Sequence, residues 1–135
     1  MNRSTIVFLT IEDVIYFHAN TIAHEGGMAG LRNRGLLESA VMMPQAAVGG
    51  RYLHRGNPAM AAAYLFHICQ AHAFFDGNKR AAVIAAIAFL KINDHTLKTT
   101  NHELIALGLG VADGTLNKSA ATIWMRRFSK RLLVR

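Results

Sequence analysis

A stretch of nine residues in the middle of the chain contains a base, an acid and two cations. It reads His72-Ala73-Phe74-Phe75-Asp76-Gly77-Asn78-Lys79-Arg80. An unperturbed imidazole titrates near ~6.5, so His72 can take a proton from an attacking hydroxyl near neutral pH. Asp76 is the only acid nearby and offers the hard oxygen ligand that Mg²⁺ prefers. These groups together favour phosphoryl or nucleotidyl transfer to a hydroxyl.

The second half of this segment predicts an anion site at the start of a helix. A helix that begins near Asn78 leaves its first amide N–H groups unpaired and concentrates partial positive charge there. Gly77 lets the preceding turn bring backbone amides close to a ligand without a clashing Cβ. Arg80 can fork onto phosphate oxygens, and Lys79 adds a point charge. The side chain of Asn78 can donate its amide to a ligand or hold the loop in shape.

Each of these residues also has an ordinary structural interpretation. The chain has seven histidines, and a lone histidine such as His72 is usually structural or solvated. Phe74 and Phe75 are expected to anchor the loop in the core rather than to stack on a ligand. The run Asp76-Gly77-Asn78 is also an ordinary turn with a helix cap. The two cations that follow oppose the helix dipole, and a bound anion would relieve that conflict, which favours a function.

Helix signals dominate the elements that must position the segment. We expect helices over about residues 10–25, 35–43, 57–71, 78–92, 100–114 and 119–133. Thr10 with Asp13, and Thr100 with Glu103, resemble capping boxes. Asn57-Pro58 predicts an N-cap followed by proline at the first helical position.

The apolar pattern indicates an all-α fold. The stretch Ala81–Leu90 is apolar on every side, which is typical of a helix at the buried centre of a bundle. We therefore expect about six helices around this central helix, with minimal strand content. Residues 48–56 carry turn residues at both ends and predict a loop or a short hairpin-like flap. A length of 135 residues suits one domain, covering residues 1–135.

Composition points to a soluble protein of a reducing compartment. Hydrophobic residues make up 52% of the chain, which is ample for a core and argues against disorder. The longest apolar run, Ala81–Leu90, is far shorter than the ~18–20 residues of a membrane span. Cys69 is the one cysteine, so an internal disulfide is impossible. With no signal peptide recognisable at the N-terminus, we expect a cytoplasmic location.

The net charge of +7 makes nucleic acid an obvious partner to consider. Much of this charge lies in the last ten residues, at Arg126, Arg127, Lys130, Arg131 and Arg135. A solvated face of the last helix explains these cations equally well. Acidic proteins and nucleotide phosphates are also natural partners for such a surface, so direct binding of nucleic acid is not expected.

The nine-residue segment resembles the signature of the Fic family, histidine-x-phenylalanine-x-acid-glycine-asparagine-x-arginine. Lys79 marks the Doc (death-on-curing) type, because most Fic adenylyltransferases carry glycine there. Other segments also look like parts of Doc proteins, so the resemblance covers most of the chain. They are Phe8–Val14, Gly26–Arg32, Gly35–Ala40, Pro44-Gln45 and Tyr64–Leu90.

The resemblance implies a role for each residue of the signature. His72 would be the general base and Asp76 would hold Mg²⁺, while Gly77, Asn78, Lys79 and Arg80 would cradle the phosphates of ATP. Doc-type toxins phosphorylate a threonine of elongation factor Tu and stop translation. A Phd-type antitoxin lays a helical tail in a groove on such toxins. By analogy, the flap at residues 51–55 would align the target segment.

Two departures from the Fic pattern bear on the reaction. Fic adenylyltransferases, which pass AMP to a protein hydroxyl, usually carry a second arginine where this chain has Val83, and its loss favours a Doc-type kinase. The run Thr21–Gly26 matches the pattern of the Fic autoinhibitory helix. Glu25 in that run would have to pair with the missing arginine, so we interpret it as the end of the first helix. An adenylyltransferase and a non-catalytic binding module remain as alternatives.

Overall fold

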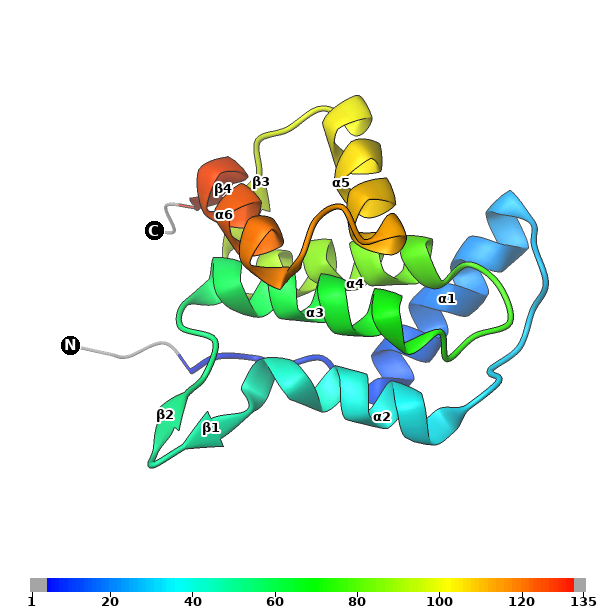
Figure 1. Ribbon diagram of the computed structural model, residues 1–135, viewed down its shortest axis with the longest axis horizontal. Coiled ribbons are helices and arrows are strands. Elements are labelled where there is room, and N and C mark those ends of the chain that lie inside the picture. The colour runs from blue at the N-terminus through cyan, green and yellow to red at the C-terminus, as the bar shows by residue number, and fades with distance from the viewer. Residues whose placement is uncertain (1–4, 133–135) are drawn as a thin grey trace.

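The computed structural model describes residues 5–132, and within them the chain forms six α-helices (Figure 1). They are α1 (Ile11–Glu25), α2 (Arg34–Met42), α3 (Asn57–Ala71), α4 (Asn78–Ile92), α5 (Asn101–Asp113) and α6 (Lys118–Phe128). A short 3₁₀ turn, Met43–Gln45, extends α2 around Pro44. The expected all-α fold class is confirmed. No helix within residues 5–132 combines the length and the apolar composition needed to cross a bilayer.

The ends of several helices follow the predicted capping chemistry. Both capping boxes are present: the hydroxyl of Thr10 accepts from the N–H of Asp13 at 3.1 Å, and Thr100 does the same for Glu103 at 3.1 Å. The prediction for α3 was wrong by one residue, because Gly56 rather than Asn57 is its N-cap. The backbone of Gly56 has a φ of +89°, which suits glycine. The side-chain amide of Asn57 does not cap the helix, because its Nδ2 lies 3.0 Å from His95 Nδ1.

Two antiparallel helices, α3 and α4, form the centre of the molecule (Figure 1). The buried residues of α4 are mostly alanines, and α3 adds three consecutive alanines, Ala61, Ala62 and Ala63. Such small side chains let the two helices lie close together. The helix expected at the centre, α4, therefore shares it with α3, which is the more buried of the two.

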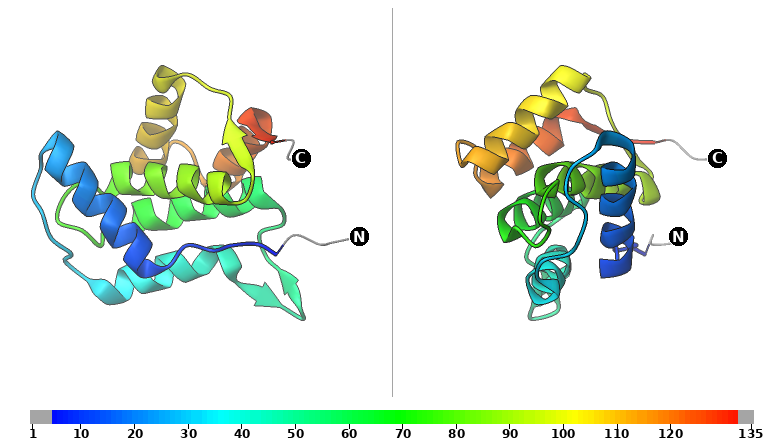
Figure 2. Two further views of the ribbon diagram at one scale, coloured as in Figure 1. Left: turned by 180° about the vertical axis from the view of Figure 1, so that it is seen from behind. Right: turned by 90° about the vertical axis from the view of Figure 1, so that its right-hand side faces the viewer.

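The other helices lie on opposite sides of this central pair. Figure 2 shows α5 and α6 on one side, α2 on the other, and α1 alongside α4. The extended N-terminal segment is tied to the core by Tyr64, whose hydroxyl accepts from the N–H of Leu9 at 2.9 Å. Burial raises the pKa of this fully buried tyrosine to about 12. The chain before α1 is thus fixed at the same core that carries the loop between α3 and α4.

A lysine between two histidines anchors the start of α6. Lys118 Nζ lies 3.0 Å from His54 Nε2 and 3.1 Å from His67 Nε2. Burial, followed by the charge of Lys118, lowers the pKa of His67 to about 4 and also lowers that of His54. Both imidazoles are therefore neutral at pH 7 and can accept hydrogen bonds from the ammonium group.

Four short strands form two separate pairs within the described residues. β1 (Ala47–Val48) and β2 (Arg51–Tyr52) make an antiparallel hairpin through Gly49 and Gly50. Both glycines have positive φ, +59° and +79°, as hairpin turns of this length require. The short hairpin-like flap expected in this region is confirmed.

The second strand pair corrects the predicted end of the last helix. We expected that helix to continue to residue 133, but α6 ends at Phe128 and β4 (Ser129–Arg131) follows. β4 pairs with β3 (His95–Leu97), and the N–H of Lys98 donates to the carbonyl of Phe128 at 2.7 Å. This long-range pairing ends the helix, while residue 133 itself lies outside the described part of the chain.

Candidate functional site

The loop between α3 and α4 begins at His72 with an unusual backbone. His72 is the C-cap of α3 and has left-handed dihedrals, φ 48° and ψ 43°. Residues other than glycine are uncommon in this region and cost ~1 kcal/mol or more there. The carbonyl of His72 accepts a hydrogen bond from the guanidinium of Arg32, which helps to hold this conformation. The side chain of His72 remains exposed, as a general base must be.

The segment that follows α1 braces the loop through its backbone. The N–H groups of Arg32 and Asn33 both donate to the carbonyl of Ala73, at 2.7 and 3.0 Å. The N–H of Phe75 donates to the carbonyl of Gly30 at 3.2 Å, and Leu31 bridges antiparallel to Phe74. Residues 73–75 of the loop therefore pair with residues 30–33 of the segment after α1.

The two phenylalanines of the loop point to opposite sides. Phe74 is 2% exposed and anchors the core as expected, but Phe75 is 55% exposed, so the prediction for Phe75 was wrong. Side chains alternate across extended backbone, and the contact with the segment after α1 imposes that geometry here. A Cβ on Gly30, which has a φ of +119°, would lie 3.1 Å from the ring of Phe75.

The side chain of Asn78 holds the loop in shape. Its Oδ1 accepts from the N–H of Phe74 at 2.9 Å, and its Nδ2 donates to the carbonyl of Phe74 at 3.0 Å. The sequence allowed this side chain either to donate to a ligand or to support the loop, and these contacts show that it supports the loop. The backbone N–H of Asn78 remains at the first position of α4.

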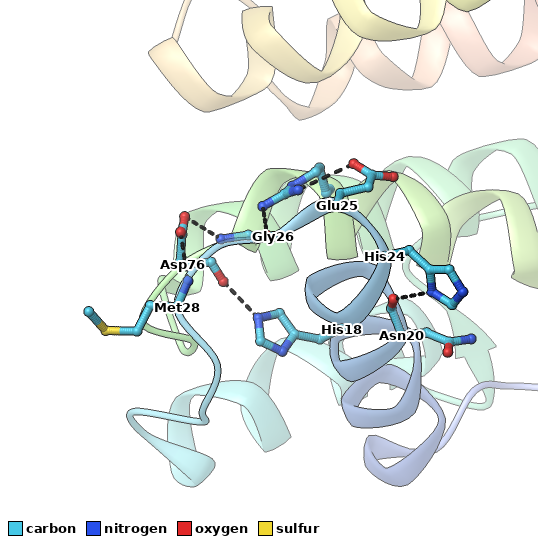
Figure 3. A network of polar contacts seen from close by, with 9 residues as sticks. His18, Asn20, His24, Glu25, Gly26, Met28 and Asp76 are labelled. Carbon is cyan, nitrogen blue, oxygen red and sulfur yellow. Dashed lines mark hydrogen bonds and ion pairs between the residues drawn. The ribbon is translucent and has the colours of Figure 1, made fainter.

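Asp76 is exposed, and backbone amides orient its carboxylate (Figure 3). Oδ2 accepts from the N–H of Met28 at 3.1 Å, and Oδ1 accepts from the N–H of Gly77 at 2.8 Å. These two hydrogen bonds, with a smaller contribution from Arg80, hold the pKa of Asp76 below its usual range. A Cβ on Gly27 would lie 2.7 Å from Oδ2, so this glycine permits the close approach.

One residue that contacts this loop, His18, was missed by the sequence analysis. Its side chain lies on α1 and is 3% exposed, and its Nε2 donates to the carbonyl of Asp76 at 2.7 Å. The ring also stacks on Phe74, with 3.7 Å between the centroids and 9° between the planes. The signal was its spacing, because Val14, His18 and Thr21 recur at helical intervals and are the buried positions of α1.

Arg80 lies in the first turn of α4 and is held by the end of α1. Its Nη1 donates to Glu25 Oε1 at 3.2 Å, and its Nη2 donates to the carbonyl of Gly26 at 3.3 Å (Figure 3). Glu25 is the last residue of α1, as interpreted from the sequence, but it does pair with an arginine of the signature. A guanidinium has five N–H donors, so these two contacts leave others for a ligand.

The start of α4 has the geometry of an anion site. Gly77 is the N-cap with a φ of +76°, and among the described residues no side chain caps this helix. The first backbone bond of the helix runs from the N–H of Ala81 to the carbonyl of Gly77 at 2.9 Å. The three N–H groups before Ala81 therefore face the loop without helical partners.

The six predicted site residues line one cavity of about 380 Å³. They are His72, Asp76, Gly77, Asn78, Lys79 and Arg80. Cys69, Phe75 and Ala112 complete the wall, and burial raises the pKa of the Cys69 thiol, which keeps it neutral. Lys79 and Arg80 also border a second, more apolar hollow of about 480 Å³ between α4 and α5.

The hairpin does not meet this cavity. It precedes the N-terminus of α3, whereas His72 follows the C-terminus of the same helix (Figure 1). Fifteen helical residues separate the two regions by about 22 Å. The expectation that residues 51–55 align a target at the site therefore finds no support in this geometry.

The donor set suits a metal that arrives with a nucleotide. Within residues 5–132, no three histidine, cysteine or acidic side chains converge on one point. Asp76 offers a single exposed carboxylate, and each of its oxygens is engaged by one N–H. Mg²⁺ is commonly bound by one or two carboxylates together with substrate phosphates and water, so Asp76 fits this ion.

Comparison with known proteins gives matches that span this site. The chain matches the model of the Fic/DOC family over residues 8–90, which run from the segment before α1 to the end of the buried part of α4. It is similar to "Toxin Doc" of Mycolicibacterium smegmatis, with 44% identity over 86 residues, which make up 64% of either chain. It thus spans less than two thirds of that relative. It is also similar to "Protein kinase doc" of Escherichia phage P1, with 30% identity over 116 residues, 86% of this chain and 90% of the other.

Proposed function

Because the chain belongs to the Fic/DOC family, we propose that it is a Doc-type toxin that transfers the γ-phosphoryl group of ATP to a protein hydroxyl. One observation carries this proposal. An exposed histidine, an ionised carboxylate and the uncapped start of α4 line the same cavity as Lys79 and Arg80. We treat residues 1–135 as one Fic/Doc domain.

His72 is the general base in this reaction. Its imidazole accepts the proton of the acceptor hydroxyl while the hydroxyl oxygen attacks the γ-phosphorus. The new O–P bond forms as the bond between the γ-phosphorus and the bridging oxygen of ADP breaks, and ADP leaves. The imidazolium then returns its proton to solvent. The left-handed backbone of His72 and its contact with Arg32 keep the imidazole at the cavity.

The start of α4 binds and stabilises the phosphates. Its free N–H groups and the positive end of its dipole face the transferring group, where negative charge is spread over several oxygens. Lys79 adds an ammonium charge, and Arg80 adds a guanidinium whose direction is set by Glu25 and Gly26. The contacts with Glu25 and Gly26 orient Arg80 in advance, so little reorganisation of this guanidinium is needed when the nucleotide binds.

Asp76 would hold Mg²⁺ in this proposal, and the ion would supply positive charge beside the phosphates. The N–H groups of Met28 and Gly77 lower the pKa of the Asp76 carboxyl group and fix the direction of the carboxylate. The protein thus supplies one oriented anionic ligand, and the remaining ligands come from phosphate and water.

The residue at position 83 favours phosphoryl over AMP transfer. Val83 stands where Fic adenylyltransferases carry a second arginine, and it borders the apolar hollow between α4 and α5. A Cβ on Gly108 would lie 3.1 Å from Val83 Cγ2, so α5 packs closely against this position. A second guanidinium for the α- or β-phosphate is therefore not provided at this point.

The proposed target and partner are those of Doc-type toxins. We propose that the acceptor is a threonine of elongation factor Tu, so that the toxin stops translation in the cytoplasm, and that a Phd-type antitoxin neutralises it. The +7 charge suits an acidic partner protein, and α5 exposes Ile105 and Leu109 to solvent. Expression should arrest growth, and arrest should disappear with His72→Ala or with co-expression of the antitoxin.

Transfer from labelled ATP tests the reaction type. Purified protein is incubated with Mg²⁺, elongation factor Tu and ATP that carries the label on the γ- or the α-phosphate, with His72→Ala as the control. Label from the γ-position should reach elongation factor Tu, and only with the unaltered protein. Label from the α-position alone would identify an adenylyltransferase. Failure of both labels, with the nucleotide bound, would point to a non-catalytic binding module.

A further inference from the structure

The buried His18 has one strong hydrogen bond, and it goes to the loop of the site. Removing an imidazole from water is costly unless its N–H groups find partners. The partner here is the carbonyl oxygen of Asp76, 2.7 Å from His18 Nε2 (Figure 3). A carbonyl can only accept, so Nε2 carries the hydrogen. His18 therefore acts as a fixed donor beneath the loop.

The direction of that carbonyl decides which polar group of one peptide faces the cavity. The carbonyl belongs to the peptide unit that joins Asp76 and Gly77. In a trans peptide the C=O and the N–H point in opposite directions. With the carbonyl turned toward His18, the N–H of Gly77 points away from α1 and donates to Asp76 Oδ1 at 2.8 Å.

Gly77 makes the opposite orientation of this peptide sterically accessible. Its φ of +76° lies in the region that glycine adopts at no cost, and a peptide unit beside a glycine can rotate with little hindrance. A rotated peptide would turn its carbonyl oxygen toward the start of α4. It would also withdraw the N–H from the carboxylate of Asp76. Both changes would oppose a bound phosphate.

We propose that His18 is a positioning residue that holds the Asp76–Gly77 peptide in the orientation that favours an anion at the start of α4. It acts through Asp76 and touches neither nucleotide nor acceptor. The ring of His18 is itself fixed by stacking on Phe74. The backbone of Phe74 is held in turn by two hydrogen bonds from the side chain of Asn78. This role rests on the proposed function, because it assumes that phosphate binds there.

Two substitutions of His18 separate the hydrogen bond from the packing. His18→Gln keeps an N–H donor at a similar distance from the backbone, whereas His18→Leu fills the space with an apolar side chain and removes the donor. His24 lies on the same helix, is exposed, and forms a hydrogen bond with the carbonyl of Asn20 at 2.8 Å, away from the loop of the site, so His24→Gln is the matched control. His18→Asn retains polarity with a shorter reach, and it replaces His18→Leu if that variant does not fold.

The first measurement is the KM for Mg-ATP in the transfer assay. Asp76 is the proposed metal ligand, and loss of a group that orients a metal ligand typically costs roughly 10- to 100-fold in metal affinity or activity. We expect such a rise in KM for His18→Leu, a value near that of the unaltered protein for His18→Gln, and no change for His24→Gln. A folded His18→Leu protein with an unchanged KM would overturn the inference.

The second measurement does not depend on catalysis. The amide resonance of Gly77 in nucleotide-free protein reports the orientation of its peptide. Both His18 variants lose the ring current of an imidazole that lies close to Gly77, so they are compared with each other. The amide of Gly77 should resonate at different positions in His18→Gln and His18→Leu, because only the first keeps the donor. If the protein transfers no group at all, the proposed function fails, but this comparison still decides the inference. Equal positions of the Gly77 amide in the two variants would refute it whatever the outcome of the assay.

Discussion

The substitution Gly27→Ala should damage the site from a position outside the signature. Gly27 has a φ of +113°, and an added Cβ would lie 2.7 Å from Asp76 Oδ2 and 3.2 Å from Arg80 Nη2. Such a methyl group forces the carboxylate away from the N–H of Met28, which it now meets at 3.1 Å. We therefore expect the groups that bind metal and phosphate to lose their present positions together.

The loss of stability can be worked out from the backbone. An alanine held in a sparsely populated conformation costs on the order of 1–3 kcal/mol. Unfolding entropy near ~2.1 cal/mol/K per residue gives roughly 0.3 kcal/mol per kelvin for a chain of 135 residues. A loss of about 2 kcal/mol should therefore lower Tm by about 7 °C. The activity per folded molecule should fall further, by roughly 10- to 100-fold.

Gly114→Ala is the matched control for this experiment. Gly114 has a φ of +85° with open space where a Cβ would stand, so alanine suffers backbone strain there without a clash. Thermal unfolding should show a loss of stability in both variants, and the loss should be at least as large in Gly27→Ala, which adds a clash to the backbone strain. The transfer assay, run well below both Tm values, should show lost activity in Gly27→Ala only. Equal activity and equal KM for Mg-ATP in the two variants would refute the idea that Gly27 sets the position of Asp76.

Two further predictions concern stability. The pKa of His67 is lowered to about 4, below its unfolded value near 6.5. Between these two pH values the unfolded chain binds more protons than the folded chain. The free energy of unfolding should therefore fall as the pH drops from about 6.5 to about 4. In urea unfolding, the free energy of unfolding should change with pH by up to ~1.4 kcal/mol per pH unit for each histidine involved. The substitution His67→Gln should reduce this slope. A free energy that does not depend on pH in the unaltered protein would contradict a neutral pair of histidines around Lys118. Asn78→Ala removes both bonds to the backbone of Phe74, at 2.9 and 3.0 Å, and should cost about 1–3 kcal/mol in denaturant unfolding. A loss of unfolding free energy below about 0.5 kcal/mol would mean that the loop keeps its shape without these two hydrogen bonds.

Local chemistry made most of the helices predictable. Capping residues such as Thr10 and Thr100 signal their helix starts within three residues of sequence, and both were confirmed. The end of α6 was not predictable in this way. It depends on pairing between residues 129–131 and 95–97, which are far apart in the chain. The apolar pattern alone could not reveal that contact.

The site shows the same division between local and distant information. The types and spacing of residues 72–80 indicated an anion site with a base, and His72 and residues 75–80 line one cavity. The support from His18 and from residues 27–33 comes from another part of the chain and was not foreseen. For the same reason Phe75 was misplaced in the core, because only the contact with Gly30 turns it outward. The position of the hairpin, by contrast, could have been foreseen, because the helix expected over residues 57–71 already separates residues 48–56 from His72.

The mass of the target protein after incubation with Mg-ATP tests the central claim most directly. Elongation factor Tu is incubated with the unaltered protein or with His72→Ala, and the modified residue is then identified by mass spectrometry of its peptides. We expect one added phosphate on a threonine with the unaltered protein and none with His72→Ala. An added AMP, or a phosphate that persists with His72→Ala, would contradict phosphoryl transfer with His72 as the base.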